Sequence, residues 1–283
     1  MPFPEETEFV LPNGLTLNSD RDADGVLITC ASVSGWGSPG SKSQGTPREG
    51  EHGNSPAPNP KLDARVLNLQ GRIDAPTRLL RQQAEHRLEA ALGLQLFDLT
   101  VVDSIELHTQ AQRSGKVDVD DDTDTACNWM AELTCPDPRR YGASKQVTMN
   151  LPSVTGGLRF PIRFPIRFTG SSISGDDTVT NEGNESAPLV VTFTGPLTTP
   201  KLTNLLTGQC VQYNDVLATQ DDFVVLYLRF PLVVLLQGTA LRTGKVSTGG
   251  GGVFGIKPGP NALSFRAAAG TGTALIEFDD TYQ

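Results

Sequence analysis

Histidine and the large aromatic residues are scarce in this chain of 283 residues, which has 3 His, 2 Trp and 4 Tyr. No HExxH, GxSxG or P-loop spacing surrounds His52, His86 or His108, or occurs elsewhere in the chain. The common metalloprotease, hydrolase and nucleotide-binding signatures are therefore excluded. We expect no catalytic residue, no cofactor and no metal ion, although carboxylates that meet only in the folded chain would escape this search.

Cysteine pairs and long hydrophobic runs are also missing. The 4 cysteines form no CxxC pair, which argues against a disulfide framework or zinc ribbon and favours ordinary buried thiols at Cys30, Cys127, Cys135 and Cys210. The most apolar window, residues 224–236, is interrupted by Arg229 and Pro231, and the first residues, MPFPEETEF, lack a basic segment followed by an apolar one. We expect neither a membrane span nor a secretory signal.

Positive charge is in deficit. The chain has 23 Lys and Arg against 32 Asp and Glu, so its formal net charge is −9, and its isoelectric point is about 4.8. Nucleic acids and anionic membranes attract basic surfaces. Neither is therefore an expected binding partner.

Glycine and proline are abundant, with 29 and 20 copies, whereas helical patterns are rare. Short apolar runs between Gly, Asn and Pro turns predict a mainly β protein, all-β apart from one α-helix. The helix is predicted at about 75–93, with Asp74 as its cap, Pro76 in its first turn and Gly93 as its stop. Its buried side is predicted to carry Leu80, Ala84, Leu88, Ala91 and Leu92, and its solvated side Arg78, Arg81, Glu85 and Glu89.

Two domains are predicted. The first, residues 1–145, contains the helix and a Gly-, Pro- and Ser-rich loop at 36–62 that has too few apolar residues to build a core. The turn CPDPRRYG closes this domain, because Pro136 and Pro138 cannot continue a central strand. The second domain, residues 146–283, has short strands at spacings typical of a two-layer β-sandwich.

An acidic run, DVDDDTD, lies between two expected strands and contains Asp118, Asp120, Asp121, Asp122 and Asp124. The spacing resembles that of calcium ligands. However, the position that an EF-hand reserves for glycine holds Thr123, and its final carboxylate would fall on Trp129. We interpret the run as a solvated acidic loop, with a patch facing a channel or a partner as the alternative.

The segment RFPIRFPIRF, Arg159 to Phe168, repeats the tetrad Phe-Pro-Ile-Arg. Apolar residues alternate with Arg159, Arg163, Arg167 and the two prolines, which is the period of a strand. The prolines remove hydrogen-bond donors from one side, so an edge strand protected against uncontrolled pairing is favoured. In a second interpretation, the arginine row docks on an acidic surface of a neighbouring subunit.

Turn residues follow a definite order in two segments of the second half, NEGNESAPLVVTFTGPLTTPKLTNLLTGQ at 181–209 and FGIKPGPNALSF at 254–265. They are Gly183, Asn184, Pro188, Gly195, Pro200, Asn204, Gly208, Pro258, Gly259 and Asn261. This order resembles the C-terminal half of siphophage distal tail proteins, including actinophage minor tail proteins. Upstream, LNLQGRI, the helix and AELTCPDPRRYG with its Asp137-Pro138 turn resemble the N-terminal domain of the same family.

The resemblance implies a structural role in a phage tail. Such proteins form homohexameric rings at the distal end of the tail, linking the tail tube protein to the tail tip, the baseplate and receptor-binding components. It also implies an N-terminal, tube-forming, β-barrel-like domain, a C-terminal galectin-like sandwich, and no catalytic residue to carry over. The protein would be assembled in the host cytoplasm and become part of the virion.

A ring that conducts genomic DNA sets two physical conditions. It needs two different complementary patches on each subunit, for which the acidic run and the arginine row are the candidates. Its lumen should also pass DNA without binding it, and a net acidic chain suits this because it does not hold phosphate.

Two other functions stay open at this stage. A carbohydrate-binding module would use the implied galectin-like sandwich, with Trp36, Trp129, Tyr213 and Tyr227 as stacking faces. The small number of aromatic residues argues against it. A hydrolase acting on envelope polysaccharide would need carboxylates assembled by folding, and no motif supports it.

Overall fold

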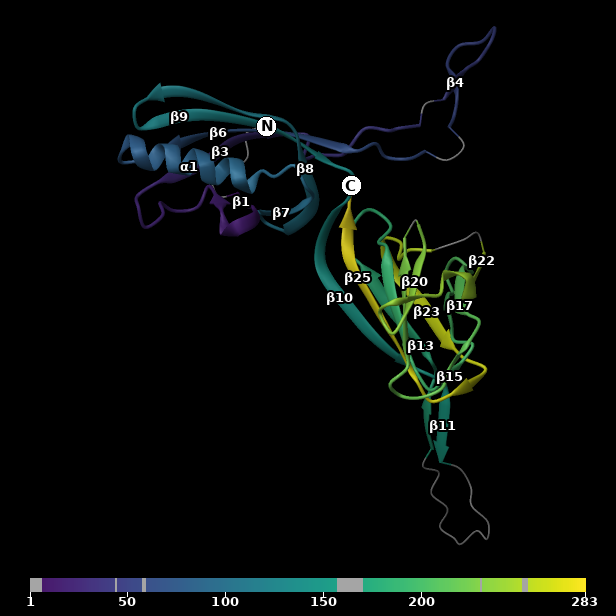
Figure 1. Cartoon of the computed structure of the whole chain (residues 1–283). Coiled ribbons are helices and arrows are strands. Elements are labelled where there is room, and N and C mark those ends of the chain that lie inside the picture. The colour runs from purple at the N-terminus through teal and green to yellow at the C-terminus, as the bar shows by residue number, and fades with distance from the viewer. Residues whose placement is uncertain (1–6, 44, 58–59, 157–169, 230, 251–253) are drawn as a thin grey trace, which may run out of the picture. The chain divides into compact units, whose positions relative to one another are not determined.

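The computed structural model describes residues 7–43, 45–57, 60–156, 170–229, 231–250 and 254–283, with the backbone alone for 154–156 and 170–173. The chain divides into an N-terminal unit, up to Gly142 together with Tyr282–Gln283, and a C-terminal unit, Ala143–Thr281. Strands dominate both units, and α1 (Arg78–Ala91) is the one α-helix of the described residues (Figure 1). The prediction of a mainly β chain with a single helix is confirmed.

One antiparallel sheet organises the N-terminal unit. Its order is β2 (Thr16–Leu17), β1 (Glu8–Val10), β7 (Phe97–Val102), β8 (Glu106–Thr123), β9 (Ala126–Cys135), β6 (Arg65–Asp74) and β3 (Leu27–Ser34). The long strand β8 joins two halves of the sheet, because residues 106–111 pair with β7, and residues 112–113, 117–121 and 123 pair with β9. A short 3-10 turn, η1 (Pro12–Gly14), lies between β1 and β2.

Helix α1 covers one face of the β9-β6 part of this sheet (Figure 1). Ala84, Leu88 and Ala91 are buried against it, as their helical spacing predicted. The predicted cap was wrong: Thr77, not Asp74, precedes the helix in an extended conformation, and its hydroxyl accepts a hydrogen bond from Leu80 N at 3.3 Å. Asp74 still belongs to β6.

The solvated side of α1 was also predicted incorrectly at one position. Arg81 is buried, because it lies under the β8-β9 hairpin and its guanidinium pairs with Asp121 and Glu85. A long side chain with a charged end satisfies both a helical and an apolar pattern, since its methylene stem packs while its head finds a carboxylate. Sequence periodicity alone therefore does not show whether an arginine on a helix is buried or exposed.

The two ends of the N-terminal sheet meet at Asn18, directly after β2. The backbone N of Asn18 donates to Ile28 O in β3 at 3.0 Å, and its side chain amide donates to Thr7 O at 2.8 Å and to Cys30 O at 3.1 Å. Cys30 N donates to Asn18 Oδ1 at 2.7 Å. No sheet of the described residues closes, however, so the expected barrel-like domain is not confirmed.

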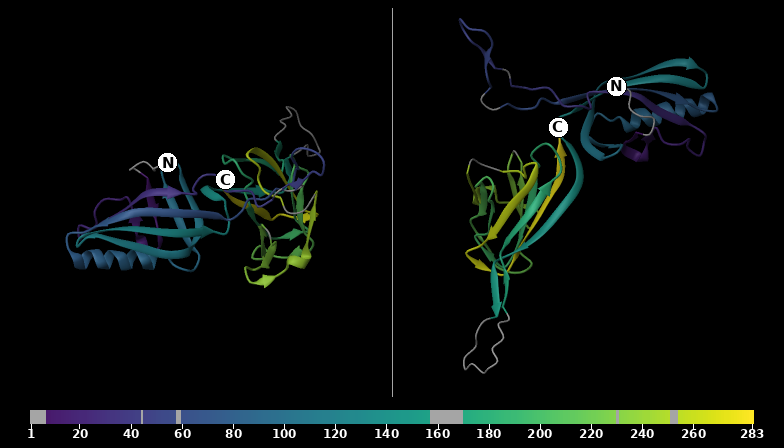
Figure 2. Two further views of the ribbon diagram at one scale, coloured as in Figure 1. Left: turned by 90° about the horizontal axis from the view of Figure 1, so that it is seen from above. Right: turned by 180° about the vertical axis from the view of Figure 1, so that it is seen from behind.

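The connection between β3 and β6 forms an arm that carries the short hairpin β4 (Thr46–Pro47) and β5 (Asn54–Ser55). The hairpin projects away from the β3-β6-β9 layer in each view (Figure 1, Figure 2). The described side chains near its tip are exposed, in line with a composition too polar to pack.

The C-terminal unit is a sandwich of two antiparallel layers. The first layer is β10 (Arg140–Asn150), β25 (Thr273–Tyr282), β14 (Leu189–Thr194), β19 (Phe223–Leu228), β20 (Val233–Leu236) and β21 (Ala240–Leu241). The second layer is β13 (Asp176–Asn181), β23 (Gly259–Arg266), β16 (Lys201–Asn204), β17 (Cys210–Tyr213) and β22 (Val246–Gly249). Phe193 of the first layer stacks on Phe265 of the second, with ring centroids 5.7 Å apart.

Smaller elements complete this unit. They are β11 (Ser153–Gly156) paired with β12 (Gly170–Ile173), the three-stranded sheet of β18 (Val216–Leu217), β15 (Leu197–Thr198) and β24 (Ala269–Gly270), and the 3-10 turn η2 (Thr243–Lys245). The unit boundary falls inside β10 and β25.

Candidate subunit interface

Asp118 to Asp122 of the acidic run lie in strand β8, not in the predicted loop, whereas Asp124 lies in the turn between β8 and β9. Residues 117–121 and 123 pair with β9, and Val117 and Val119 pack against the core while Asp118 and Asp120 point to the opposite face. The residues that pair with β9 therefore alternate as a strand requires. The loop in this interpretation is wrong for Asp118 to Asp122, because pairing with β9 supplies the backbone with hydrogen bonds that acidic composition alone does not predict. The side chains from Asp120 to Asp124 are exposed to solvent.

Arginine and lysine side chains of the same unit form ion pairs with the acidic run. Asp121 accepts a hydrogen bond from Arg81, and Asp122 lies 2.8 Å from Arg72. Two further pairs are Asp124 with Arg78 at 3.6 Å and Asp118 with Lys116 at 2.7 Å. The hydrogen bond from Arg81 lowers the pKa of Asp121. Within the described residues Asp120 has no ion pair, so most of the acidic charge is neutralised internally.

The arginine row is outside the described residues, since Arg159, Arg163 and Arg167 fall within 157–169. Its expected edge position and its pairing with the acidic run stay predictions.

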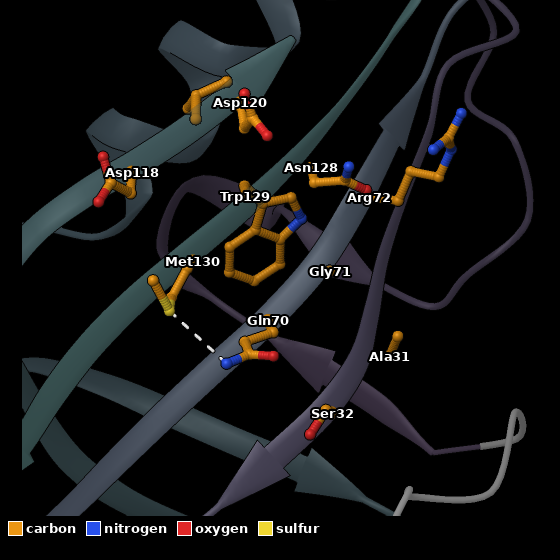
Figure 3. A pocket seen from close by; sticks show the side chains of 11 residues that line it. Ala31, Ser32, Gln70, Gly71, Arg72, Asp118, Asp120, Asn128, Trp129 and Met130 are labelled. Atoms are coloured by element: carbon orange, nitrogen blue, oxygen red, sulfur yellow. Dashed lines mark hydrogen bonds between the residues drawn. The ribbon is translucent and has the colours of Figure 1, made fainter. Parts of the chain in front are cut away.

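The face of β3, β6, β9 and β8 opposite the helix forms a shallow groove of about 850 Å³, whose lining mixes polar side chains with apolar ones such as Ala31 and Met130. Figure 3 shows Gln70, Arg72, Asn128 and Met130 along it, with the indole of Trp129 at its floor. Trp129 itself is buried and donates from Nε1 to Thr29 O at 3.1 Å. The groove therefore offers hydrogen-bonding groups, and α1 occupies the other side of the sheet.

Two edges of this four-stranded part are unpaired in the described chain. No described strand pairs with the far side of β8 along residues 114–123, and β3 meets only the Asn18 contact on its outer side. The β3 edge, LITCASVS, contains no charge and no proline. Exposed strand edges usually carry a charge or a proline as protection, because an unpaired strand is a template for pairing with another chain.

Arg65 anchors the base of the arm. Its buried guanidinium donates to Gly35 O at 2.9 Å, Trp36 O at 2.7 Å and Gly37 O, and to Pro138 O at 2.7 Å. Burial lowers the pKa of Arg65 to about 10. One side chain thus fixes both the start of the arm and the Asp137-Pro138 turn.

That turn is closed by Asp137. Its carboxylate accepts from Arg139 N at 3.1 Å and from the Tyr141 hydroxyl at 2.7 Å. Burial raises the pKa of Tyr141, so the phenol stays a donor to Asp137. The turn residues of the predicted resemblance therefore have a structural role here.

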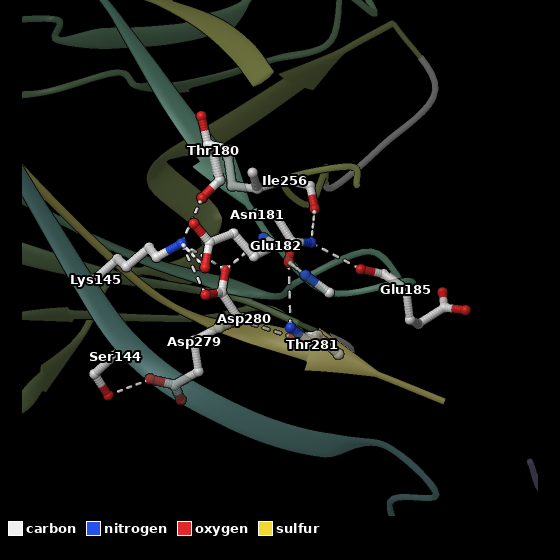
Figure 4. Close-up of polar contacts among 11 residues, drawn as sticks. Ser144, Lys145, Thr180, Asn181, Glu182, Glu185, Ile256, Asp279, Asp280 and Thr281 are labelled. Atoms are coloured by element: carbon white, nitrogen blue, oxygen red, sulfur yellow. Dashed lines mark hydrogen bonds and ion pairs between the residues drawn. The ribbon is translucent and has the colours of Figure 1, made fainter. Parts of the chain in front are cut away.

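In the C-terminal unit the turn that contains Gly183 and Asn184 is built around buried Asn181 (Figure 4). The Asn181 amide donates to Glu185 O at 2.8 Å and Ile256 O at 3.0 Å, and its Oδ1 accepts from Gly183 N at 2.9 Å. A Cβ on Gly183 would lie 1.9 Å from Thr281 O, so only glycine fits.

Beside this turn, Lys145 of β10 meets buried Asp280 of β25 at 2.8 Å and donates to Thr180 O at 3.0 Å (Figure 4). Burial would lower the pKa of Lys145, but its contacts with Asp280 outweigh this effect and raise it. The pair is therefore an ion pair that joins the first and last strands of the sandwich.

A second pair of turns is connected through Asn204 and Asn261, both fully buried. Asn204 Nδ2 donates to Asn261 Oδ1 at 3.3 Å, and Asn261 Nδ2 donates to Lys257 O at 2.7 Å. The remaining turn residues flank strands: Pro188 before β14, Gly195 after it, Pro200 before β16, Gly208 with φ 71° between β16 and β17, and Pro258 and Gly259, the latter with φ 84°, at the start of β23.

Comparison with solved structures places this architecture among known folds. Dit (gp 19.1) of phage SPP1, described as a paradigm of the hub adsorption apparatus in phages that infect Gram-positive bacteria, is similar to this chain with a TM-score of 0.66 and 12% identity. The similarity covers 98% of this chain and 99% of the SPP1 chain. The chain has the Dit fold. No protein-family model and no curated protein matches its sequence.

The Dit fold was predicted from the turn residues, and the structure confirms it at the level of fold. It also corrects the carbohydrate interpretation at three of four positions. Trp36, Trp129 and Tyr213 are buried and offer no stacking face, whereas Tyr227 is half-buried. No described group of three or more His, Cys, Asp and Glu residues forms a metal site, and no described helix is long and apolar enough to span a bilayer.

Sequence reasoning missed Arg65, Asn18 and the two free edges of the Dit fold. Arg65 and Asn18 have no distinguishing neighbours in the sequence, since their partners are backbone carbonyls distant in the chain. The sequence around β3 contained one indication of an edge, an uncharged strand beside a long polar loop. Which strands lie at a sheet edge is decided, however, by strand pairing in the folded chain. Of the 4 cysteines, Cys30, Cys127 and Cys135 are buried and Cys210 is partly exposed.

Proposed function

We propose that this protein is a structural distal tail protein of a phage, six copies of which form a ring between the tail tube protein and the tail tip with its receptor-binding components. The observation that carries the proposal is the similarity to SPP1 Dit over nearly the whole of both chains. It includes both units, not one common module. The protein would act at the distal end of the virion tail after assembly in the host cytoplasm.

The free strand edges support ring closure. The uncharged part of the β3 edge beyond Cys30, which Asn18 leaves unpaired, can add to the unpaired part of β8 on the next copy by backbone hydrogen bonding. The two edges differ, so the contact is heterologous. Such a contact closes into a ring when the rotation from one subunit to the next is a whole fraction of a full turn. In this proposal the β3 edge meets the acidic strand, and the pairing of the arginine row with that strand stays a separate prediction.

The face opposite α1 supports a DNA-conducting lumen. Of its basic residues, Arg72 is paired with Asp122 and Lys116 with Asp118. Asp120 and Glu132 add negative charge to the same face. DNA binds where unpaired Lys or Arg side chains neutralise its phosphates and release their counterions. The described part of this face has no unpaired cation, so DNA would pass without specific binding.

Mass photometry and negative-stain imaging of the purified chain, alone and with the tail tube protein, test the proposal. We expect sixfold rings, at least in the presence of the tube protein, because mass action can require a neighbour for closure. A chain that stays monomeric at high concentration and in the presence of the tube protein would contradict it.

A further inference from the structure

The ion pair between Lys145 and Asp280 differs from the other lysine–aspartate pairs of the described residues. Lys145 Nζ lies 2.8 Å from Asp280 Oδ2, and the Asp280 side chain is only 3% exposed. The two other pairs are open to solvent on both sides, with at least 41% of each side chain exposed: Lys116 with Asp118, and Lys245 with Asp215. In the Lys145 pair alone, an amine and a carboxyl group meet where water has little access.

Backbone groups hold both partners of this pair in place (Figure 4). Lys145 Nζ donates to Thr180 O at 3.0 Å, and Glu182 N donates to Asp280 Oδ1 at 2.7 Å. A hydrogen bond to Oδ1 stabilises negative charge that develops on this oxygen when the carboxyl carbon is attacked, as an oxyanion-hole donor does. The amine therefore lies against a carboxyl group that is prepared for nucleophilic attack.

A third ionisable group completes the site. The carboxylate of Glu182 lies 3.7 Å from Lys145 Nζ, and the Glu182 side chain is 71% exposed. A carboxylate in this position can take a proton from the amine and pass it on. Among the described residues, neither Lys116 nor Lys245 pairs with a second carboxylate.

We propose that Lys145 and Asp280 react with each other after folding and form an amide bond between Nζ and Cγ. One proton first moves from Nζ to the carboxylate, which gives a neutral amine and a carboxylic acid, and burial favours such uncharged groups. The amine then attacks Cγ. Glu182 removes a proton from Nζ and delivers it to the departing hydroxyl group, which leaves as water. One C–N bond forms, one C–O bond breaks, and no oxidant or cofactor is required.

The ion pair is the resting state of the site. Its contacts raise the pKa of Lys145, so the amine keeps its proton against solvent, but the transfer to Asp280 leaves the proton within the pair. The neutral pair is a minor state, and one reaction in the lifetime of each chain requires no more. Fixed contact supplies an effective concentration on the order of 10⁵–10⁸ M. The buried surroundings also keep out the water that would hydrolyse the product.

The bond closes the sandwich at both of its ends. The C-terminal unit runs from Ala143 to Thr281, so Lys145 and Asp280 lie within two residues of its ends, in its first and last strands β10 and β25. Tension applied at these ends then passes through the amide bond and does not separate the strands. The inference concerns a single chain and does not depend on the proposed ring.

Intact mass spectrometry of the denatured full chain tests the bond. The wild-type chain should be lighter than its sequence by the mass of one water molecule. Lys145→Arg is the matched control, because it keeps the charge but not the nucleophilic amine, and it should show its full mass. Proteolytic digestion of wild type should give a branched peptide that joins the segments around Lys145 and Asp280, and none from the two exposed pairs. A wild-type chain of full mass, or a lost water that digestion places elsewhere, would overturn the inference.

Glu182→Gln tests how the bond forms. In freshly synthesised chain followed over time, this variant should form the bond on the order of a hundredfold more slowly than wild type. Glu182 is exposed, so the variant should fold, which thermal unfolding checks. Equal rates would overturn the part assigned to Glu182. Rings of full-mass chain would reject this inference and leave the ring standing, whereas cross-linked monomers would reject the ring alone.

Discussion

Asn18 holds the two ends of the N-terminal sheet together through one side chain amide. Removing it in Asn18→Ala breaks three hydrogen bonds, from Asn18 to Thr7 O and Cys30 O and from Cys30 N, and forces alanine into φ 63°. We expect a loss of about 1.5–4.5 kcal/mol, at about 0.5–1.5 kcal/mol for each of the three bonds. Amide hydrogen exchange of residues 27–34 measures this loss of stability locally. A local measurement does not require both units to unfold together.

Two further variants separate the loss of hydrogen bonds from the backbone strain at Asn18. Asn18→Gly tolerates the positive φ, so it should lose the hydrogen bonds without the strain and fall between wild type and alanine. Asn68→Ala is the control, because the one hydrogen bond from its amide is a 3.4 Å contact to Ser34 at the surface. If Asn18→Ala and Asn68→Ala exchange alike, Asn18 does not hold the sheet ends together.

Asp121 makes the bond between α1 and the acidic strand depend on pH. Arg81 lowers the pKa of this carboxyl in the folded state, so the stabilisation is present above the ordinary value of about 3.9 and is lost as pH falls through the folded pKa. Asp121→Asn should therefore lower the thermal unfolding midpoint at pH 7. The gap from wild type should narrow below about pH 3.9, where wild-type Asp121 also becomes neutral.

The neighbouring Asp120→Asn is the matched control for this titration, because Asp120 lies on the other face of β8 with no ion pair among the described residues. Its midpoint should follow wild type at every pH. An equal gap for Asp121→Asn at pH 7 and at the lowest pH where both stay folded would show that the Arg81 pair contributes nothing.

At the scale of the element, the start of α1 tests which residue caps the helix. Thr77→Ala removes the hydroxyl that accepts from Leu80 N and should cost about 1 kcal/mol. Asp74→Ala removes only a part-exposed pair with Arg72 and should cost less than about 0.5 kcal/mol. Hydrogen exchange across residues 78–91 ranks the two, and a larger effect of Asp74→Ala would restore the original assignment.

At the scale of the whole molecule, charge on the β3 edge tests ring closure. Ser32 lies on this edge, and the β8 edge proposed to meet it is acidic. Ser32→Glu should shift the assembly towards single subunits, whereas Ser32→Lys should preserve or strengthen it. The difference should shrink in about 0.5 M salt because screening shortens electrostatic range.

Mass photometry of both variants measures this shift. Equal assembly of the glutamate and lysine variants would mean that β3 does not meet the acidic strand. The control is the same pair of charges at Thr203, on the outward side of the second layer of the C-terminal unit. That position does not lie on the proposed ring contact, so it should leave assembly unchanged.

The sequence by itself determined what depends on local chemistry. Glycine, proline and asparagine at spaced turns predicted a mainly β chain and the Dit fold, because each turn needs its own residue types within a few positions. Gly183 and Asn204 are examples, since the backbone at one and the side chain at the other permit few substitutes. The apolar spacing of Ala84 and Leu88 likewise predicted a helix with one buried side.

Only the tertiary structure decided what depends on distant pairing. The acidic run became a strand because β9 lies beside it, and Arg81 became buried because that strand brought Asp121 over the helix. Asn18 and Arg65 bind backbone carbonyls far away in the chain, which no local pattern records. Strand alternation shows that a side chain faces one side or the other, but only the packed layers reveal which side is covered and which is left for a partner.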